Sequence, residues 1–321
     1  MNRTLKRVAG SAGVLMHAGS VRTMFGPPGD AKFERAVHGK VALVTGASAG
    51  TGAAVARQLG EAGATVILVA RSQDKLQAVQ ADIAGAGGLA HVHPCDMSDV
   101  DAVARLASDV LERHGRVDIV VSNAGKSIRR SLELSYDRFR DFQRTIDVNY
   151  NGPVRLMLAL IPQMRANGGG HIINVSTMGV YLPSPRYSAY LASKSAFDMW
   201  VRCVGPELRK DGIAFTSMYF GLVHTDMSAG TTMYRYMPGL TPERAADDVA
   251  WALVRRPLTT GPTWAKYVGL AAEVARTPWE RLNAAYYDIS LDSASARGVE
   301  GDGGFEVPLM GAALKRAGII K

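Results

Sequence analysis

The chain has 321 residues, of which 47% are hydrophobic and 21% are charged. This composition is typical of a globular protein with a sizeable core, and the lack of any run of about 18 apolar residues argues against a membrane-spanning helix. The two cysteines, Cys95 and Cys203, lie far apart in the sequence. They give no disulfide framework and predict a cytoplasmic location.

The formal net charge of +8 is concentrated at the N-terminus. Residues 1–40 hold seven Lys and Arg residues and two acidic residues, which accounts for +5 of the total. We predict a basic, partly flexible extension over residues 1–38, either solvated or in peripheral contact with an anionic membrane surface. A signal peptide is not expected, because glycines interrupt the apolar stretch of this segment, and no nucleic-acid partner is expected.

Strand and helix patterns alternate from residue 39 onward. Short apolar, β-branched runs predict strands over residues 40–46, 64–71, 89–95, 117–125 and 171–177, and helical spacing predicts helices over 51–63, 72–87 and 98–115. Ser72 and Ser98 are the expected N-caps of the second and third helices. This alternation predicts an α/β fold, a Rossmann-type doubly wound parallel sheet in three layers (α/β/α). We expect a single domain over residues 39–285 and an irregular tail over 286–321.

The first strand leads into the glycine-rich segment TGASAGTG, which contains Gly46, Gly50 and Gly52. These glycines permit a tight turn and let a pyrophosphate approach the backbone N–H groups at the start of the next helix. The alternative is that they serve only the close packing of helix on sheet. Their place between the first strand and the first helix favours a dinucleotide site, to which Ser48 and Thr51 also belong.

The choice of dinucleotide depends on the second strand, which ends in Arg71 with no acidic residue beside it. An acidic residue there would bind the ribose of NAD, whereas a guanidinium suits the 2′-phosphate of NADP(H), so we predict NADP(H). The alternative is an ordinary surface arginine. Asp96 either bonds the adenine edge or caps a turn. Asn123, Ala124 and Gly125 end the fourth strand, where open α/β sheets bind ligands.

His91, His93 and Cys95 alternate along the third predicted strand. Ligands at these positions would approach a metal from one side only, and the sequence offers no further Cys/His cluster to complete the site. We therefore predict no metal.

Tyr190 and Lys194 lie four residues apart in AYLASKSAFDMW, a segment that can be helical, so they share a helix face. A nearby ammonium favours the phenolate and lowers the pKa of a tyrosine from its usual value of about 10. The lysine can also hold the nicotinamide ribose. The pair predicts a proton donor beside a hydride donor, as carbonyl reduction requires. Tyr181 and Tyr187 have no lysine at this spacing and are expected to pack or to line a substrate pocket.

TGASAGTG, NAG, the Asn of DVNYNG, a hydroxyl after HIINV, and YLASK occur in this order along the chain. Together they resemble the short-chain dehydrogenase/reductase family over about residues 38–260. The resemblance implies a catalytic set made of Asn149, a hydroxyl residue, Tyr190 and Lys194. The family spacing places the hydroxyl at Thr177, with Ser176 as the alternative. It also implies a homodimer or homotetramer.

A narrower resemblance is carried by NAGKSIRRSLELSYDRFRDFQRTIDVNY, PRYSAYLASKSAFD and the later LVHTDM. These segments are similar to bacterial aldehyde-forming fatty acyl-CoA reductases of the short-chain type. The resemblance implies that Thr225 binds the nicotinamide carboxamide and that a substrate lid covers about residues 222–245. Arg129 and Arg130 would meet the CoA phosphates or, alternatively, begin a solvated basic helix. The other substrate-binding candidates, whose alternative role is ordinary packing, are Ser127, Met227, Met233 and Tyr234.

We therefore predict an NADPH-dependent oxidoreductase that reduces a fatty acyl-CoA thioester to an aldehyde, with Tyr190 as proton donor. One alternative is a reductase or dehydrogenase of another lipid-like ketone, aldehyde or alcohol, which would use the same catalytic residues. A remoter alternative is a non-catalytic cofactor-binding protein at a membrane surface. The intact Tyr190 and Lys194 pair argues against this last alternative.

Overall fold

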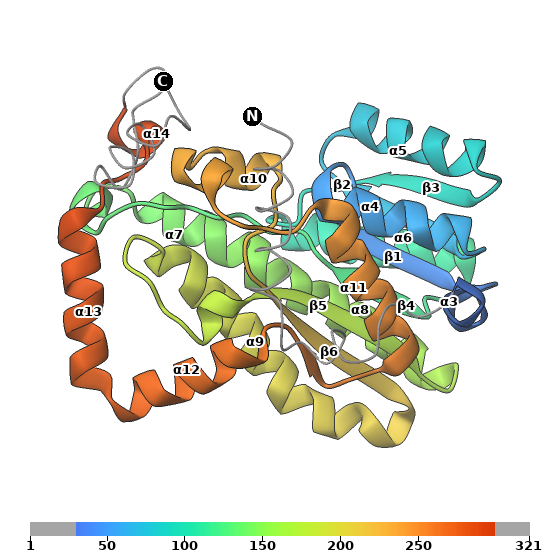
Figure 1. The fold of residues 1–321 in the computed structure, drawn as a ribbon. Helices are drawn as coiled ribbons and strands as arrows, with labels where there is room; N and C mark the ends of the chain where they lie inside the picture. The colour runs from blue at the N-terminus through green and yellow to red at the C-terminus, as the bar shows by residue number, and fades with distance from the viewer. Residues whose placement is uncertain (1–29, 299–321) are drawn as a thin grey trace.

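The computed structural model describes residues 30–298. Seven parallel strands form one sheet in the order β3-β2-β1-β4-β5-β6-β7 (Figure 1). The strands are β1 Val41–Thr45, β2 Thr65–Ala70, β3 Leu89–Pro94, β4 Ile119–Ser122, β5 Gly170–Thr177, β6 Ile213–Phe220 and β7 Thr259–Thr260. The chain therefore winds outward from β1 in both directions, as the doubly wound prediction requires. The predictions for residues 1–29 and 299–321 lie outside the described residues.

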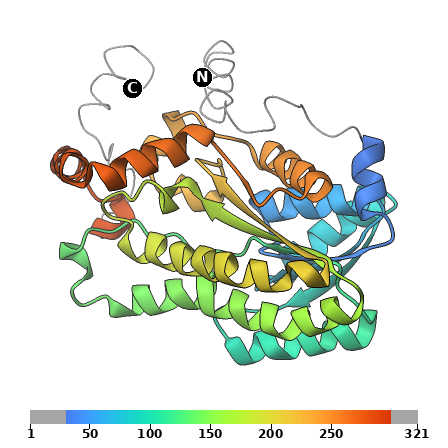
Figure 2. The same cartoon turned by 90° about the horizontal axis from the view of Figure 1, so that it is seen from below.

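Helices cover both faces of the sheet (Figure 2). The larger ones are α3 Asp30–Val37, α4 Gly50–Glu61, α5 Gln73–Gly85, α6 Val100–His114, α7 Phe139–Ile146, α8 Gly152–Ala166, α9 Ser188–Leu208, α11 Pro242–Arg255, α12 Thr263–Val274 and α13 Arg276–Ile289. The shorter ones are α10 Asp226–Ala229, α14 Ala294–Arg297, the 3₁₀ turns η1 Glu133–Ser135, η3 Met178–Val180, η4 Arg209–Asp211 and η5 Thr232–Tyr236, and the π-helical turn η2 Asp147–Asn151.

The core lies in two layers, one on each face of the sheet. Apolar residues of α4, α5 and α11 pack on one face, and those of α6, α8 and α9 pack on the other. All five residues of β1 are buried, because helices cover both faces of the parallel sheet. Burial on both sides explains why the strands are continuous apolar runs in the sequence.

Two predicted helix starts differ from the structure in detail. Asp99, not Ser98, caps α6: its Oδ1 accepts hydrogen bonds from the N–H groups of Asp101 and Ala102 at 3.0 and 2.9 Å. Ser98 is turned away because its hydroxyl donates to Asp96 Oδ1 at 2.8 Å. Ser72 stands at the N-cap of α5 but makes no capping hydrogen bond through its side chain.

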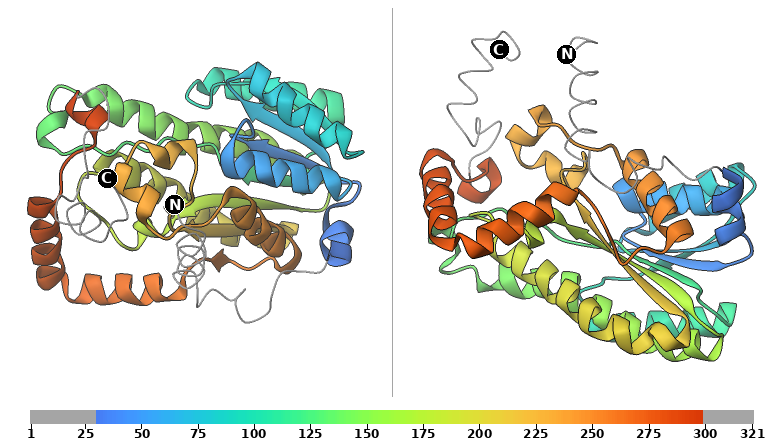
Figure 3. Two further views of the ribbon diagram at one scale, coloured as in Figure 1. Left: turned by 45° about the horizontal axis from the view of Figure 1, so that its top comes forward. Right: turned by 60° about the horizontal axis from the view of Figure 1, so that its bottom comes forward.

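The C-terminal part of the chain is more regular than its sequence indicates. Helix α13 continues to Ile289 and α14 spans Ala294–Arg297, so two parts of the stretch that we expected to be irregular from residue 286 are helical. The sequence 276–289 is free of glycine, and the Gly, Ser and Asp residues that suggested a tail become dense only beyond it. α12 and α13 meet in a bend at Ala275 and run around one side of the molecule (Figure 3). Within residues 30–298, no helix has the length and apolar character needed to cross a membrane.

Candidate active site

The loops after strands β1 to β6 meet at the carboxyl edge of the sheet and enclose a cleft of about 1320 Å³. The cleft is lined by every predicted cofactor residue except Gly52 and by every substrate candidate except Tyr181. The position agrees with the rule that open α/β sheets bind ligands at this edge. The structure thus brings together residues that are up to 188 positions apart, from Gly46 to Tyr234.

The glycine-rich segment forms a cradle at one end of this cleft. Gly46 and Gly50 have positive φ angles of +69° and +55°, and a Cβ atom at Gly46 would lie 2.9 Å from Asn123 Nδ2. Gly52 has a different role, since a Cβ there would lie 2.2 Å from the carbonyl oxygen of Gly46. Helix α4 begins at Gly50 without a side-chain cap, because its N-cap residue is Ala49. The first N–H groups of this helix therefore remain available to an anionic ligand.

The second strand leads to Arg71, whose side chain is 67% exposed and whose Nη1 lies 3.9 Å from Asp96 Oδ2. Burial raises the pKa of Asp96, but hydrogen bonds from Ser98 and the Arg71 guanidinium lower it overall. Asp96 therefore does cap a turn, and it lines the cleft as well. On the other side, Thr225 contacts the cradle, because a Cβ at Gly50 would lie 3.0 Å from its Cγ2.

The predicted acid and its lysine both lie on α9. Tyr190 makes a side-chain hydrogen bond with Thr177, the last residue of β5. Ser176 lies one position earlier on the strand and faces the other side, where its Oγ is buried with no hydrogen-bond partner among residues 30–298. The geometry therefore pairs Tyr190 with Thr177 and not with Ser176.

The pKa values of this pair differ from the prediction. Burial raises the pKa of Tyr190 to about 12, although the Thr177 hydroxyl acts in the opposite direction. Burial also lowers the pKa of Lys194 to about 8. The expectation that Lys194 lowers the pKa of Tyr190 is not met in the ligand-free protein. The physical reason is that desolvation dominates both pKa values, while the Lys194 ammonium donates to the carbonyl oxygen of Val175 at 2.9 Å.

Asn149 lies in the π-helical turn η2, at the join of α7 and α8. Its Oδ1 accepts from the Lys126 N–H at 2.9 Å, and its Nδ2 donates to the Lys126 carbonyl at 2.9 Å and to Ser193 Oγ at 2.8 Å. Ser193 in turn donates to the carbonyl oxygen of Tyr190 at 2.7 Å. Asn149 thus ties the end of β4 to α9. π-Helical turns are frequent at functional sites. Sequence reasoning missed Ser193, whose only signal was its place beside Lys194.

The substrate end of the cleft is rich in aromatic residues. The hydroxyl groups of Tyr187 and Tyr234 are hydrogen-bonded to each other, and the ring of Tyr187 lies 6.3 Å from that of Tyr190. Met233 is buried, whereas Met227 is exposed. Tyr181 does not line the cleft: its ring packs 4.5 Å from that of Tyr219.

The two arginines after the NAG turn are not equivalent. Arg130 Nη1 donates to the carbonyl oxygen of Ala296 at 3.0 Å, and its Nε lies 3.4 Å from Asp141. Arg129 is only 8% exposed, and neither of its terminal nitrogens has a hydrogen-bond partner among residues 30–298. The structure therefore contradicts the alternative of a solvated basic helix start, because both arginines are enclosed by other segments and neither begins a helix.

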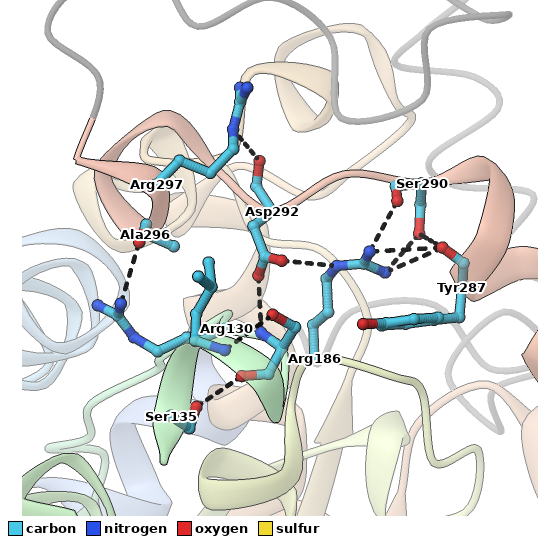
Figure 4. Close-up of polar contacts among 10 residues, drawn as sticks. Arg130, Ser135, Arg186, Tyr287, Ser290, Asp292, Ala296 and Arg297 are labelled. Carbon is cyan, nitrogen blue, oxygen red and sulfur yellow. Dashed lines mark hydrogen bonds and ion pairs between the residues drawn. The ribbon is translucent and has the colours of Figure 1, made fainter. Parts of the chain in front are cut away.

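Sequence reasoning also missed the contribution of the C-terminal region. Tyr286, Ser293 and Ala296 line the cleft. Buried Arg186 holds this region in place through hydrogen bonds to Ser290 Oγ and O, both at 2.7 Å (Figure 4). The only signal in the sequence was Arg186 itself, the one charged side chain in the stretch before Tyr190.

His91 on β3 lies 4.6 Å from the ring of His114 on α6, a partner that the sequence did not indicate. In residues 30–298, no group of three or more His, Cys, Asp or Glu side chains is arranged to hold a metal ion. Burial lowers the pKa values of His93 and His114.

Comparison with known proteins places this site among related enzymes. Residues 40–234 match the family model for short chain dehydrogenases. The chain is 47% identical over 228 residues to a fatty acyl-CoA reductase of Acinetobacter baylyi, covering 71% of this chain and 77% of that protein. It is 46% identical over 268 residues to an uncharacterized oxidoreductase of Mycobacterium tuberculosis, covering 83% and 79%. A crystal structure of a metagenomic short-chain oxidoreductase in complex with NADP superposes with a TM-score of 0.61 at 36% identity, covering 68% of this chain and 93% of the other.

Proposed function

The chain belongs to the short-chain dehydrogenase family, and on this premise we propose that it is an NADPH-dependent reductase of fatty acyl-CoA thioesters that yields aldehydes. The observation that carries the proposal is a single cleft lined by the glycine cradle, by Tyr190 with its hydrogen-bond partner Thr177, and by aromatic and Met side chains. Relatives named fatty acyl-CoA reductases, 47% and 44% identical to this chain, support the substrate class.

The residues at the cradle fit a phosphorylated dinucleotide. A side chain at Gly46 or Gly50 would fill the space beside Asn123 or Thr225, and the open N-terminus of α4 suits a pyrophosphate. The exposed Arg71 guanidinium suits a 2′-phosphate, and solved relatives with NADP bound support this preference. When bound, NADPH supplies the hydride for the reaction.

The chain's own residues manage the proton. Tyr190 donates its phenolic proton to the carbonyl oxygen of the substrate, and Thr177 orients both groups through its hydroxyl. Lys194 is positioned by the Val175 carbonyl to hold the ribose and to bring positive charge toward Tyr190. Asn149 holds both backbone groups of Lys126 and so fixes the loop along which a water chain would return a proton to Tyr190.

The substrate end suits an acyl thioester. Met227, Met233 and Tyr234 lie along the cleft and offer a polarizable, adaptable surface for an acyl chain. Reduction of the thioester carbon gives a thiohemiacetal, whose carbon–sulfur bond breaks to release the CoA thiol and leave the aldehyde. One hydride and one proton are consumed: the hydroxyl of the thiohemiacetal loses its proton as the carbonyl re-forms, and the leaving thiolate takes up a proton.

The proposal is tested by NADPH oxidation with dodecanoyl-CoA, followed in parallel by release of free thiol. We expect one thiol to be released for each NADPH oxidised when the thioester is reduced to the aldehyde, and loss of turnover by at least hundredfold in Tyr190→Phe. Tyr181→Phe is the matched control, because Tyr181 packs on Tyr219 outside the cleft. If NADPH is oxidised with ketones or aldehydes as substrates, but no acyl-CoA releases a thiol, the protein belongs to the alternative reductase class.

Assembly and location form a separate part of the proposal. We propose a homo-oligomer in solution, with the basic N-terminal extension in contact with anionic membrane surfaces. Light scattering on the full chain measures the oligomeric state. Co-sedimentation of the protein, with and without residues 1–35, with vesicles containing phosphatidylglycerol measures the membrane contact.

A further inference from the structure

Arg129 is a buried cation whose terminal nitrogens have no partner in the part of the chain that the structure describes. Its side chain lies in the wall of the cleft, the residue is 8% exposed, and both Nη atoms lack hydrogen-bond partners among residues 30–298. Burying a charge without a partner is costly, so such groups are rare unless a ligand completes them. The position of Arg129 therefore calls for an external anion.

The carboxylates around Arg129 are already engaged by other groups. Asp292 lies 3.3 Å from the Nε of Arg186 and accepts a hydrogen bond from the Ser131 N–H at 2.7 Å. Asp141 pairs with Arg130 and Arg138. Other arginines thus hold Asp292 and Asp141, and among residues 30–298 neither carboxylate pairs with Arg129.

A C-terminal strap, residues 290–297, keeps this arrangement rigid. Arg186 binds Ser290 and Asp292, and Arg130 binds the carbonyl oxygen of Ala296 (Figure 4). The backbone N–H of Arg130 also donates to the Arg186 carbonyl at 2.7 Å. The residues that follow Arg129, Arg130 and Ser131, are therefore held between the loop at Arg186 and the strap.

The surroundings of Arg129 place it at the substrate end of the cleft. Arg129 and Tyr187 line the same cleft, where burial, Tyr234 and Tyr286 raise the pKa of the Tyr187 hydroxyl and the charge of Arg129 acts to lower it. The ring of Tyr187 lies 6.3 Å from the ring of Tyr190. The glycine cradle and Arg71, which suit the phosphates of the dinucleotide, lie on other loops.

We infer that Arg129 binds an oxyanion carried by the substrate, through the fork of its two free Nη groups, and that it selects anionic substrates over neutral ones. The inference deepens the proposed function and rests on it. A phosphate or a carboxylate would each fit a bidentate guanidinium contact. The oxyanion comes either from the CoA phosphates or from a carboxylate on the acyl chain, and the experiment separates these sources.

The test compares kcat/KM for two matched pairs of substrates in the full-length enzyme with saturating NADPH. The first pair is dodecanoyl-CoA and dodecanoyl-pantetheine, which lacks the phosphates. The second is dodecanal and the aldehyde of the same length that ends in a carboxylate. We expect Arg129→Met to lower kcat/KM by about tenfold to hundredfold for the charged member of one pair only. The affected pair identifies the source of the oxyanion, and Arg129→Lys should restore part of the loss.

Arg165→Met is the matched control. Arg165 lies on α8, outside the cleft, with its Nε hydrogen-bonded to Asp211 at 2.7 Å. The Arg165→Met substitution should therefore leave kcat/KM for all four substrates within twofold of the wild-type values. An equal loss for charged and neutral substrates in Arg129→Met, or no loss for either, would overturn the inference. If the wild-type enzyme reduces aldehydes but no acyl-CoA, the proposed function fails and the aldehyde pair alone decides the inference.

Thermal unfolding gives a second readout that does not need turnover. We expect Arg129→Met to be at least as stable as the wild type, because it removes an unpaired buried charge, whereas a structural role would lower Tm. In protein saturated with NADP⁺, coenzyme A or dodecanedioate should raise Tm of the wild type but not of Arg129→Met. If neither ion raises Tm of the wild type, the inference is wrong.

Discussion

Replacing Lys194 by Met should remove a pH dependence of stability that belongs to this side chain alone. Lys194 is 7% exposed, and burial lowers its pKa from 10.5 to about 8. Each pKa unit corresponds to 1.36 kcal/mol, so the buried ammonium destabilises the ligand-free fold by about 3 kcal/mol relative to the neutral amine. The hydrogen bond to Val175 is lost in the variant at every pH, and it therefore does not affect the pH profile.

The direction in which stability changes with pH follows from the number of protons that each state binds. Below pH 8 Lys194 is protonated in both states, and the full cost of burying the charge is present. Between about pH 8 and pH 10.5 the unfolded state binds more protons than the folded state, so stability rises with pH. Relative to Lys194→Met, the wild type should gain about 2 kcal/mol between pH 7 and pH 9.5.

Urea unfolding of the cofactor-free proteins, followed by tryptophan fluorescence at several pH values, measures this difference. The exposed residue Lys210 provides the control, because the gap between the wild type and Lys210→Met should not change with pH. A constant gap between the wild type and Lys194→Met across this range would refute the reasoning. The reason would be that Lys194 is then not desolvated in the folded protein.

Three further changes test other parts of the site. Arg71→Ala should raise the KM for NADPH about tenfold and leave that for NADH nearly unchanged, because only NADPH carries the 2′-phosphate. Thr177→Val should lower kcat about hundredfold and Ser176→Ala less than twofold, and the opposite order would give the role to Ser176. Asp292→Ala should lower the free energy of unfolding by about 3 kcal/mol in urea, because Arg186 would keep a buried, uncompensated charge. A loss under 1 kcal/mol would show that this pair does not hold the strap.

The placement of the strands and of the glycine cradle could be read from the sequence, because both depend on local patterns. Residues 41–44 (VALV) are apolar because β1 is covered on both faces, and the strand leads directly into the turn at Gly46. Tyr190 and Lys194 lie one helical turn apart, so their shared face follows from spacing alone. Helix ends were less predictable, as Asp99 in place of Ser98 shows, since adjacent polar residues compete for one cap.

The order of the elements in the chain, by contrast, does not show which distant segments come together to complete the site. Tyr190 has a raised pKa because the assembled protein excludes water from it, an effect that no spacing contains. Arg129 and Arg130 are adjacent and chemically identical in the sequence. Only the tertiary structure brings Asp141 and Ala296 to Arg130 and leaves the buried Nη groups of Arg129 without a partner among residues 30–298.

The sequence by itself therefore determined the fold class, the cradle and the pair of Tyr190 and Lys194, because each depends on residues close together in the chain. Tertiary structure decided the contact between Tyr190 and Thr177, the exclusion of Tyr181 from the cleft, and the role of the C-terminal strap. These features depend on burial and on contacts between distant segments. Desolvation and charge pairing are properties of the folded molecule, and so the selectivity that we infer for Arg129 could be recognised only there.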